Sequence, residues 1–185
     1  MMELVRPALA HLPSYEAALR RGWSPDNIRK LDATREELSG IGKDAALFVE
    51  RMVDREALGG PVTLADGSQV ARLPGYRLWM WDGEFCGSIG FRWQPGTSAL
   101  PPHVLGHIGY SVVAWKQRLG YGTRALALML EEVRKEGLAY VEITTDTDNA
   151  ASQKVILANG GSEVERFDKP AALGGKPTIR YRIEL

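Results

Sequence analysis

A glycine-containing turn with cations on both sides is the part of this sequence best suited to bind an anion. The stretch WKQRLGYGTRALALML (residues 115–130) holds glycines at 120 and 122, cations at Lys116, Arg118 and Arg124, and then an apolar run. Backbone N–H groups at a helix N-terminus are unpaired and carry partial positive charge. Glycine lets a phosphate approach such a backbone closely. The stretch predicts a phosphate site, although an ordinary turn before a helix can have the same letters.

A dinucleotide-binding fold is one alternative interpretation of the same stretch. GYGTRA fits the pattern G-x-G-x-x-A, and Glu142 follows Gly122 by twenty residues, the spacing typical of that fold. However, AWKQRL separates the preceding β-rich run from the first glycine, and the β-rich run around Glu142 continues beyond it. No G-x-x-x-x-G-K-[ST] pattern is present, which excludes a P-loop. QRLGYG (117–122) instead matches Q/R-x-x-G-x-G/A, a pattern that favours a pyrophosphate cradle.

The elements that must position this loop form a strand–helix–strand unit. We expect a strand in HVLGHIGYSVV (103–113), a helix from about Gly122 to Glu136 that ends at Gly137, and a strand in LAYVEITTD (138–146). A short helix is expected in NAASQKVILANGG (149–161). A helical crossover joins strands that run in the same direction, so the unit predicts one parallel pair.

The remaining elements predict an α/β (α+β) fold with a mixed, mostly antiparallel central sheet flanked by helices. YRLWMW-DG-EFCGSIGFRW (76–93) is typical of a hairpin that turns at Asp82-Gly83, and two more strands end the chain. Helices are expected in SYEAALRRGW (14–23) and KDAALFVERMVDREALGG (43–60), with N-caps at Ser14 and Asp44 and a shorter helix between them. We expect one domain over residues 1–185, helical in 1–75 and with its core in 76–185.

Composition narrows the function classes. The 23 Lys and Arg residues balance 23 Asp and Glu residues, which argues against binding nucleic acid through bulk charge. No stretch approaches 18 apolar residues and no signal-like segment opens the chain, so we expect no membrane partner. The single cysteine, Cys86, indicates a cytoplasmic protein and is more typical of a buried thiol than of a nucleophile. The three histidines lack metal-ligand spacing, so we expect no metal.

Two motifs in order resemble the GNAT superfamily of acyl-CoA-dependent N-acyltransferases. GHIGYSVVAWKQRLGYGTRAL (106–126) is similar to that family's fourth strand and pyrophosphate loop, and VEITTDTDNAASQKVILANGG (141–161) to its fifth strand and following helix. The serine in the second motif is similar to the ribosomal-protein N-terminal acetyltransferase branch. The resemblance covers about residues 76–185. It implies that acetyl-CoA is the co-substrate and that its acetyl group passes directly to an amine.

The resemblance also implies which residues hold CoA. Backbone N–H groups of the loop would receive the pyrophosphate, and the end of the preceding strand would pair with the pantetheine arm and offer an N–H to the oxyanion. Asn149 would contact the CoA arm, and it is also a good helix N-cap. The residues expected to bind the cofactor are Val112, Val113, Gln117, Arg118, Leu119, Gly120, Tyr121, Gly122, Thr123 and Asn149.

Three residues are candidates for proton transfer. Ser152 stands where a serine of the similar branch faces the CoA thiolate, whereas Ile156 stands where many relatives place a tyrosine. His107 stands where several members place a glutamate base, and histidine has a pKa suited to that role. Glu142, in the adjacent strand, is the second candidate base. The alternatives are structural roles for these side chains and a chain of water molecules that takes the proton.

The acceptor and two other functions stay open at this stage. The resemblance implies that residues 12–75 set the acceptor, which we expect to be a small-molecule or peptide amine: a free amino acid, an antibiotic, a polyamine or a protein N-terminus. A homodimer is compatible with the sequence. An acyl-CoA-binding or sensing domain of the same fold would bind CoA without turnover, and a nicotinamide-dinucleotide binder would be stabilised by NAD instead.

Overall fold

Two antiparallel sheets form the centre of the molecule. In the computed structural model, which describes residues 1–64 and 66–185, the first sheet has the order β1 (Glu3–Val5), β5 (Gly75–Trp81), β6 (Phe85–Arg92), β7 (Ile108–Val112), and β2 (Val53–Asp54) also pairs with β5. The second sheet has the order β8 (Tyr140–Asp146), β10 (Pro177–Glu184), β9 (Ser162–Asp168). Strands β3 (Val62–Thr63) and β4 (Gln69–Val70) pair separately. The pairings within all these sheets are antiparallel.

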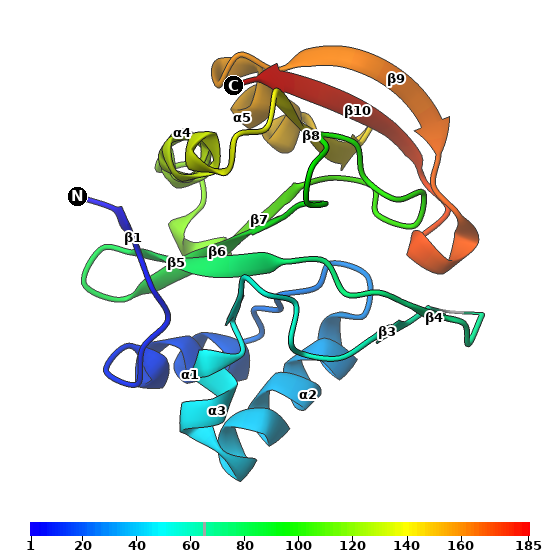
Figure 1. The fold of residues 1–185 in the computed structure, drawn as a ribbon. Helices are drawn as coiled ribbons and strands as arrows, with labels where there is room; N and C mark the ends of the chain where they lie inside the picture. Colours follow the sequence, from blue (N-terminus) through cyan, green and yellow to red (C-terminus); the bar gives the residue numbers. More distant parts are fainter. Residues whose placement is uncertain (65) are drawn as a thin grey trace.

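Helices lie on both faces of the first sheet (Figure 1). Helices α1 (Leu12–Arg20), α2 (Lys30–Lys43) and α3 (Ala45–Glu50) lie on one side of it. Helices α4 (Tyr121–Val133) and α5 (Ala150–Ala158) lie on the other side, together with the second sheet. Three short 3₁₀ segments, η1 (Ala114–Lys116), η2 (Arg134–Glu136) and η3 (Ala171–Leu173), complete the described elements. The first sheet is therefore the middle layer of the molecule.

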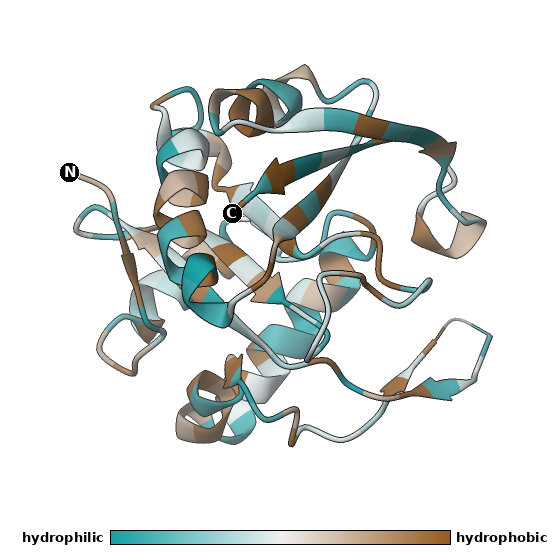
Figure 2. Cartoon of the chain, turned by 45° about the horizontal axis from the view of Figure 1, so that its top comes forward, coloured by the Kyte–Doolittle hydropathy of each residue, from teal (hydrophilic) through white to brown (hydrophobic). Residues whose placement is uncertain are grey.

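Two apolar clusters hold these layers together. Leu126, Met129 and Val133 form the buried stripe of α4 and pack with alternate residues of β8 such as Val141 and Ile143. The second cluster joins α1 to the opposite face of the first sheet through residues that include Tyr15, Leu19, Trp79 and Phe85. Figure 2 shows the corresponding interleaving of hydrophobic and hydrophilic residues along helices and strands. Full burial of each such large side chain contributes about 1.5–3 kcal/mol.

Several local predictions are confirmed. Asp82 and Gly83 lie in the turn between β5 and β6, and the left-handed φ of +112° at Gly83 suits glycine. Asp44 caps α3 by accepting a hydrogen bond from the Leu47 N–H at 2.9 Å. Gly137, with φ +73°, ends the α4–η2 segment. Cys86 is fully buried.

The N-terminal part differs from the sequence prediction. The first 75 residues contribute β1 and β2 to the main sheet, because runs this short leave no periodic signal. Helix α3 ends at Glu50 since Val53 and Asp54 pair with β5. Ser14 lies inside α1 and does not cap it; its Oγ accepts a hydrogen bond from the Phe85 N–H at 2.8 Å.

The predicted crossover connects two sheets and does not create a parallel ladder. The His107 N–H donates to the Glu142 carbonyl at 2.7 Å, and the Glu142 N–H donates to His107 Nδ1 at 2.9 Å. Among the described residues, β7 and β8 form no ladder beyond this point. The expected single sheet is thus split: β7 and β8 meet at His107 and separate towards α4 and α5.

Candidate active site

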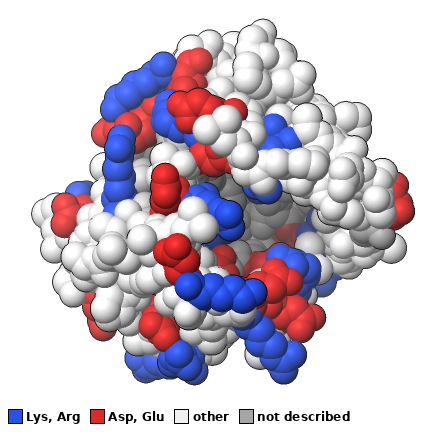
Figure 3. Space-filling model, turned by 60° about the horizontal axis from the view of Figure 1, so that its bottom comes forward, with Lys and Arg blue, Asp and Glu red and all other residues white. Residues whose placement is uncertain are grey.

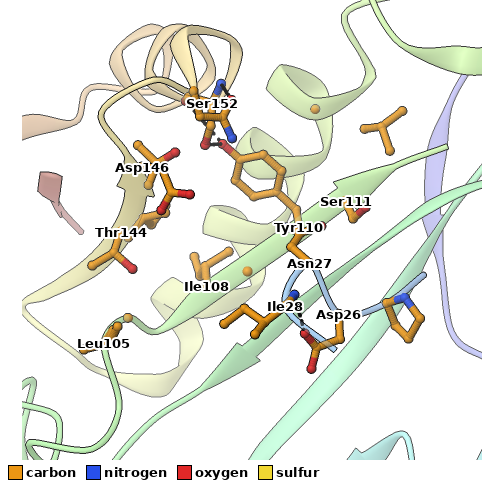
Figure 4. A pocket seen from close by; sticks show the side chains of 18 of the residues that line it. Asp26, Asn27, Ile28, Leu105, Ile108, Tyr110, Ser111, Thr144, Asp146 and Ser152 are labelled. Carbon is orange, nitrogen blue, oxygen red and sulfur yellow. Dashed lines mark hydrogen bonds between the residues drawn. The ribbon is translucent and has the colours of Figure 1, made fainter. Parts of the chain in front are cut away.

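A cleft of about 1540 Å³ opens where β7 and β8 separate. Its walls come from β7, the loop before α4, the end of β8 and the start of α5. Figure 4 shows the Tyr110 ring extending from β7 towards Ser152, with Thr144 and Asp146 of β8 beside it. A second cavity of about 820 Å³ lies on the α2–α3 side of the sheet and shares Arg92, Tyr110 and Ser111 with the cleft. The two cavities therefore adjoin along β7.

The loop from 118 to 123 presents a row of unused backbone N–H groups. Arg118 (φ +62°) and Gly120 (φ +77°) are both in the left-handed region. The first N–H bonded in α4 is that of Arg124, which donates to the Gly120 carbonyl at 3.0 Å. Within the described part of the chain, the N–H groups of residues 118–123 have no acceptor. Such a row at a helix N-terminus suits a phosphate or pyrophosphate.

The two glycines of this loop differ in whether the backbone requires them. Gly120 adopts a backbone conformation that side chains disfavour, while a Cβ there would meet nothing within 4 Å. Gly122 has an ordinary φ, but a Cβ there would lie 3.4 Å from Val155 Cγ2 and 4.0 Å from Tyr110 Cε2. Gly120 therefore sets the turn, whereas a Cβ at position 122 would make only ordinary van der Waals contacts with β7 and α5.

The cations around the loop are less available than the sequence suggests. Lys116 pairs with Asp82 at 2.9 Å and with Glu84 at 2.8 Å, and Arg124 Nε donates to the Met2 carbonyl at 2.6 Å. These two side chains tie the loop and α4 to other parts of the fold. Arg118 is exposed, and no carboxylate in the described residues pairs with it. Of the three predicted cations, Arg118 remains the one suited to a ligand phosphate.

Asp82 fixes the loop to the β5–β6 hairpin. It accepts hydrogen bonds from Lys116 Nζ and from Tyr121 OH, the latter at 2.6 Å. Burial opposes ionisation, but the hydrogen bonds from Tyr121 and Lys116 hold the pKa of Asp82 well below its usual range. Tyr121 thus contributes its backbone N–H to the loop, whereas its hydroxyl serves the hairpin.

Of the two valines predicted to bind CoA at the end of β7, only Val112 has a backbone N–H that faces the gap. The Val113 N–H donates to the Cys86 carbonyl at 2.9 Å, and Val113 is fully buried, so its N–H is not available to CoA. Because hydrogen-bonding directions alternate along an antiparallel strand, the N–H groups of Val112 and Tyr110 point away from β6 into the gap. Val112 therefore fits the predicted role beside the pantetheine. Its carbonyl accepts a hydrogen bond from Gln117 Nε2 at 3.5 Å.

The start of α5 brings two predicted residues and one unpredicted residue together. Asn149 Oδ1 accepts a hydrogen bond from the Ser152 N–H at 3.0 Å, so its N-cap role is confirmed. The Tyr110 hydroxyl lies 2.9 Å from Ser152 Oγ and donates to the Ser152 carbonyl at 3.3 Å. Burial raises the pKa of Tyr110, and the bond to Ser152 opposes this only partly. Tyr110 is therefore a protonated hydroxyl at neutral pH.

Tyr110 and Asn159 are the site residues that sequence reasoning missed. The strand alternation that exposes position 112 to the gap also exposes position 110, and this signal was present in GYSVV. Asn159 Nδ2 donates to the Thr123 carbonyl at 3.2 Å and to the Val155 carbonyl at 2.8 Å. Asn159 thereby ties the end of α5 to the first turn of α4, next to the N–H row.

The structure does not place His107 in the cleft. Its side chain is fully buried, its Nδ1 accepts the Glu142 N–H, and its Nε2 is enclosed without a partner among the described residues. Burial lowers the pKa of His107, so the imidazole is neutral and joins the two sheets. The structure does not favour His107 as the general base, because its basic nitrogen already holds a backbone hydrogen bond.

Glu142 is also unsuited to act as the base. Its carboxylate accepts a hydrogen bond from Arg182 at 2.7 Å and lies 3.6 Å from Arg180 Nε, both on the neighbouring strand β10. Only 14% of its side chain is exposed, and Glu142 is not among the residues that line the cleft. Two guanidinium groups of β10 therefore occupy the carboxylate. Glu142 holds the second sheet together.

The comparisons with known proteins agree with this geometry. Residues 14–162, most of the chain, match the family model described as "Acetyltransferase (GNAT) domain". The chain belongs to this family. It is an acetyl-CoA-dependent acetyltransferase, with acetyl-CoA as its co-substrate. No curated protein matches this GNAT chain.

Solved structures show the same fold at low identity. The microcin C7 self-immunity acetyltransferase MccE, solved with acetyl-CoA and AMP, is 16% identical with a TM-score of 0.65, covering 100% of this chain and 92% of its own. RimL, the ribosomal L7/L12 α-N-protein acetyltransferase solved with coenzyme A, is 17% identical with a TM-score of 0.63, covering 100% and 94%. A Salmonella typhimurium acetyltransferase that modifies the N-terminal serine of L7/L12 is 17% identical with a TM-score of 0.61, covering 100% and 95%.

The residues present fit acetyl-CoA without a metal ligand set. The N–H row at 118–123 suits the pyrophosphate, and the gap between β7 and β8 offers main-chain groups beside it. In residues 1–64 and 66–185, no cluster of His, Cys, Asp and Glu side chains is placed to hold a metal ion. No helix in these ranges has the length and apolarity that a membrane span needs.

Proposed function

We propose that this GNAT acetyltransferase is an N-acetyltransferase that moves the acetyl group directly from acetyl-CoA to an amine. The observation that carries the proposal is the pairing of the N–H row at 118–123 with the Tyr110–Ser152 hydroxyl pair across one cleft. The acceptor nitrogen bonds to the thioester carbonyl carbon, the carbon–sulfur bond breaks, and CoA leaves as a thiolate. The chain must then supply a binding site, a proton donor and an exit for the amine proton.

The chain's own groups divide these tasks between the two ends of the cleft. The N–H groups of 118–123, with Arg118, hold the pyrophosphate. The Val112 N–H, which points into the gap, stabilises the negative charge that develops on the carbonyl oxygen. Ser152 and Tyr110 donate a hydrogen bond, and through it a proton, to the leaving sulfur. Neither hydroxyl is ionised at neutral pH, so the pair acts as a donor and not as a base.

The amine proton needs an acceptor that faces the cleft. Of the three histidines, His103 lines both cavities, whereas His107 is enclosed in the core. We assign the proton to His103, because a neutral imidazole that faces the cleft can accept it. A base in this position stands on the acceptor side, away from the hydroxyl pair that serves the sulfur. The two proton transfers then involve separate groups.

A thiol-release assay tests this function. The protein is mixed with acetyl-CoA and a panel of amines that includes amino acids, polyamines and a peptide with a free N-terminal serine. Release of CoA thiol that depends on one of the amines, together with an acetylated product of that amine by mass spectrometry, supports the proposal. Stabilisation by CoA without amine-dependent release supports a non-catalytic acyl-CoA-binding domain instead. Stabilisation by NAD and not by CoA would contradict both.

A further inference from the structure

The adjoining cavity has an open floor of small residues. Gly90 of β6 lies opposite Gly109 of β7, and Ser88 lies opposite Ser111 in the next pair of the same ladder. A Cβ at Gly109 would meet nothing within 4 Å, so the sheet is bare there and space remains above it. Ser111 Oγ accepts a hydrogen bond from Trp23 Nε1 at 3.1 Å. Tyr110, the β7 residue between Gly109 and Ser111, lines both cavities, so the floor adjoins the cleft along the edge strand β7.

Two arginines, Arg77 and Arg92, line both this cavity and the cleft, and within the described part of the chain only Arg77 pairs with a carboxylate. Arg77 of β5 donates to Glu37 Oε1 at 3.1 Å, and the other oxygen of Glu37 accepts the Tyr15 hydroxyl at 2.6 Å. Arg92, at the end of β6, lines both cavities. In the described ranges, no carboxylate pairs with Arg92 and no acceptor takes a hydrogen bond from its side chain. This wall thus carries one positive charge more than Glu37 balances.

The guanidinium of Arg92 is accessible and has a like charge beside it. Desolvation lowers the pKa of Arg92, and the nearby Arg77 guanidinium lowers it further. The residue as a whole is exposed, so water reaches it in the free protein and a ligand anion can take the place of that water. A guanidinium presents a planar fork of donors that matches the two oxygens of a carboxylate or a phosphate. Figure 3 shows a hollow on one face of the molecule with both Lys or Arg atoms and Asp or Glu atoms around it.

We propose that the amine acceptor carries an anionic oxygen group, a carboxylate or a phosphate, that binds Arg92. This inference rests on the proposed N-acetyltransfer and names the class of its acceptor. The anion sits at Arg92, the body of the acceptor lies over the Gly90–Gly109 floor, and the amine extends past Ser111 to Tyr110 and the thioester. Polyamines and other acceptors without an anion are disfavoured, because they bring a second cation to a wall that is already positive.

The test uses matched acceptors that differ in the anion alone. Each amino acid is compared with its amide, and each aminoalkyl phosphate with its amino alcohol, in the thiol-release assay. The wild-type protein should prefer the anionic member of each pair by about tenfold to a hundredfold in kcat/KM. The carboxylate and phosphate pairs show which of the two groups is used. A preference for the neutral members or for polyamines would overturn the inference while leaving N-acetyltransfer intact.

Variants of Arg92 test whether the preference for anionic acceptors depends on this side chain. R92Q should raise KM for the anionic acceptor about tenfold to a hundredfold with KM for acetyl-CoA unchanged, and R92K should recover part of it. R166Q is the matched control, since Arg166 lies on β9 and lines neither cavity. An R92Q protein that keeps the wild-type KM for the acceptor contradicts the inference.

A binding readout keeps the inference testable if no amine turns over. The same panel is added to the protein with CoA present, and the melting temperature is measured. Stabilisation by the anionic members that R92Q abolishes supports the Arg92 site even where thiol release fails, in which case the proposed function alone is wrong. Equal stabilisation of wild type and R92Q, or none by any anionic member, overturns the Arg92 site.

Discussion

The phenolic oxygen of Tyr110 lies 2.9 Å from the hydroxyl oxygen of Ser152, so a strand of the first sheet contacts the first turn of α5 across the cleft. The two residues are 42 positions apart in the sequence, so it is the fold that brings them together. Ile156 is fully buried and stands where many GNAT relatives place a tyrosine. In this chain the tyrosine hydroxyl beside the serine comes from β7 instead.

Removing the Tyr110 hydroxyl should slow acetyl transfer without weakening CoA binding. Tyr110→Phe keeps the ring that packs beside Gly122 but removes the donor, so we expect kcat to fall about tenfold or more. Ser152→Ala should act on the same step, and the double variant should lose less than the product of the two single losses. Tyr140→Phe is the control, because Tyr140 lies outside both cavities. Losses that multiply would show that the two hydroxyls act independently.

Gly120 and Gly137 provide a matched pair at opposite ends of the α4–η2 segment. Both have a φ in the left-handed region, and a Cβ at either would meet nothing within 4 Å. Alanine at either position should therefore cost a similar amount of stability, about 1–2 kcal/mol. Only Gly120→Ala should also weaken CoA binding, measured by calorimetry, because it disturbs the N–H row. Equal CoA affinity for the two variants would remove the loop from the binding site.

Replacing Arg118 should affect CoA binding, whereas replacing Lys116 should affect the stability of the fold. Arg118→Ala should raise the Kd for CoA about twofold to fivefold, and added salt should reduce the difference, since the charge is exposed. Lys116→Ala should mainly lower the melting temperature, because Lys116 holds Asp82 and Glu84 of the hairpin. Calorimetry and thermal unfolding of both variants check this. A larger loss of affinity in Lys116→Ala would assign the phosphate to Lys116.

Asp82 should make the fold sensitive to acid. Its pKa in the folded protein lies below the ordinary value of 3.8. The stability that its charge contributes is therefore fully present above that value and is lost as the pH falls towards the lower folded pKa. Urea unfolding of wild type and Asp82→Asn should show a constant difference above about pH 5 that shrinks below about pH 4. A difference that grows on acidification would contradict the depressed pKa.

Replacing His107 should lower the stability of the fold, whereas replacing His103 should slow acetyl transfer. His107→Ala leaves the Glu142 N–H without an acceptor, so we expect a loss of about 1–3 kcal/mol from that group alone and a melting temperature several degrees lower. The pH dependence of kcat/KM should keep its shape in that variant. His103→Gln should instead lower kcat/KM while the melting temperature stays close to wild type. The reverse pattern would return the base role to His107.

The sequence predicted local chemistry better than long-range pairing. The hairpin turn, the Asp44 and Asn149 caps and the glycine loop depend on residues a few positions apart, and all lie where the letters indicated. The ion pairs of Lys116 and Glu142 depend on partners 34 and 40 positions away, which no local pattern reveals. His107 shows the same limit. Its type and place suggested a base, but only the fold shows that its nitrogen is occupied by the separating strand β8.

The most direct measurement is amide hydrogen exchange of the loop at 118–123 in the full chain, with and without ligand. These N–H groups have no acceptor among residues 1–64 and 66–185, and we propose that they bind the CoA pyrophosphate. CoA should slow their exchange strongly, whereas pantetheine, which lacks the pyrophosphate, and NAD should leave it nearly unchanged. Slowing by NAD with no effect of CoA, or equal slowing by pantetheine and CoA, would contradict the account.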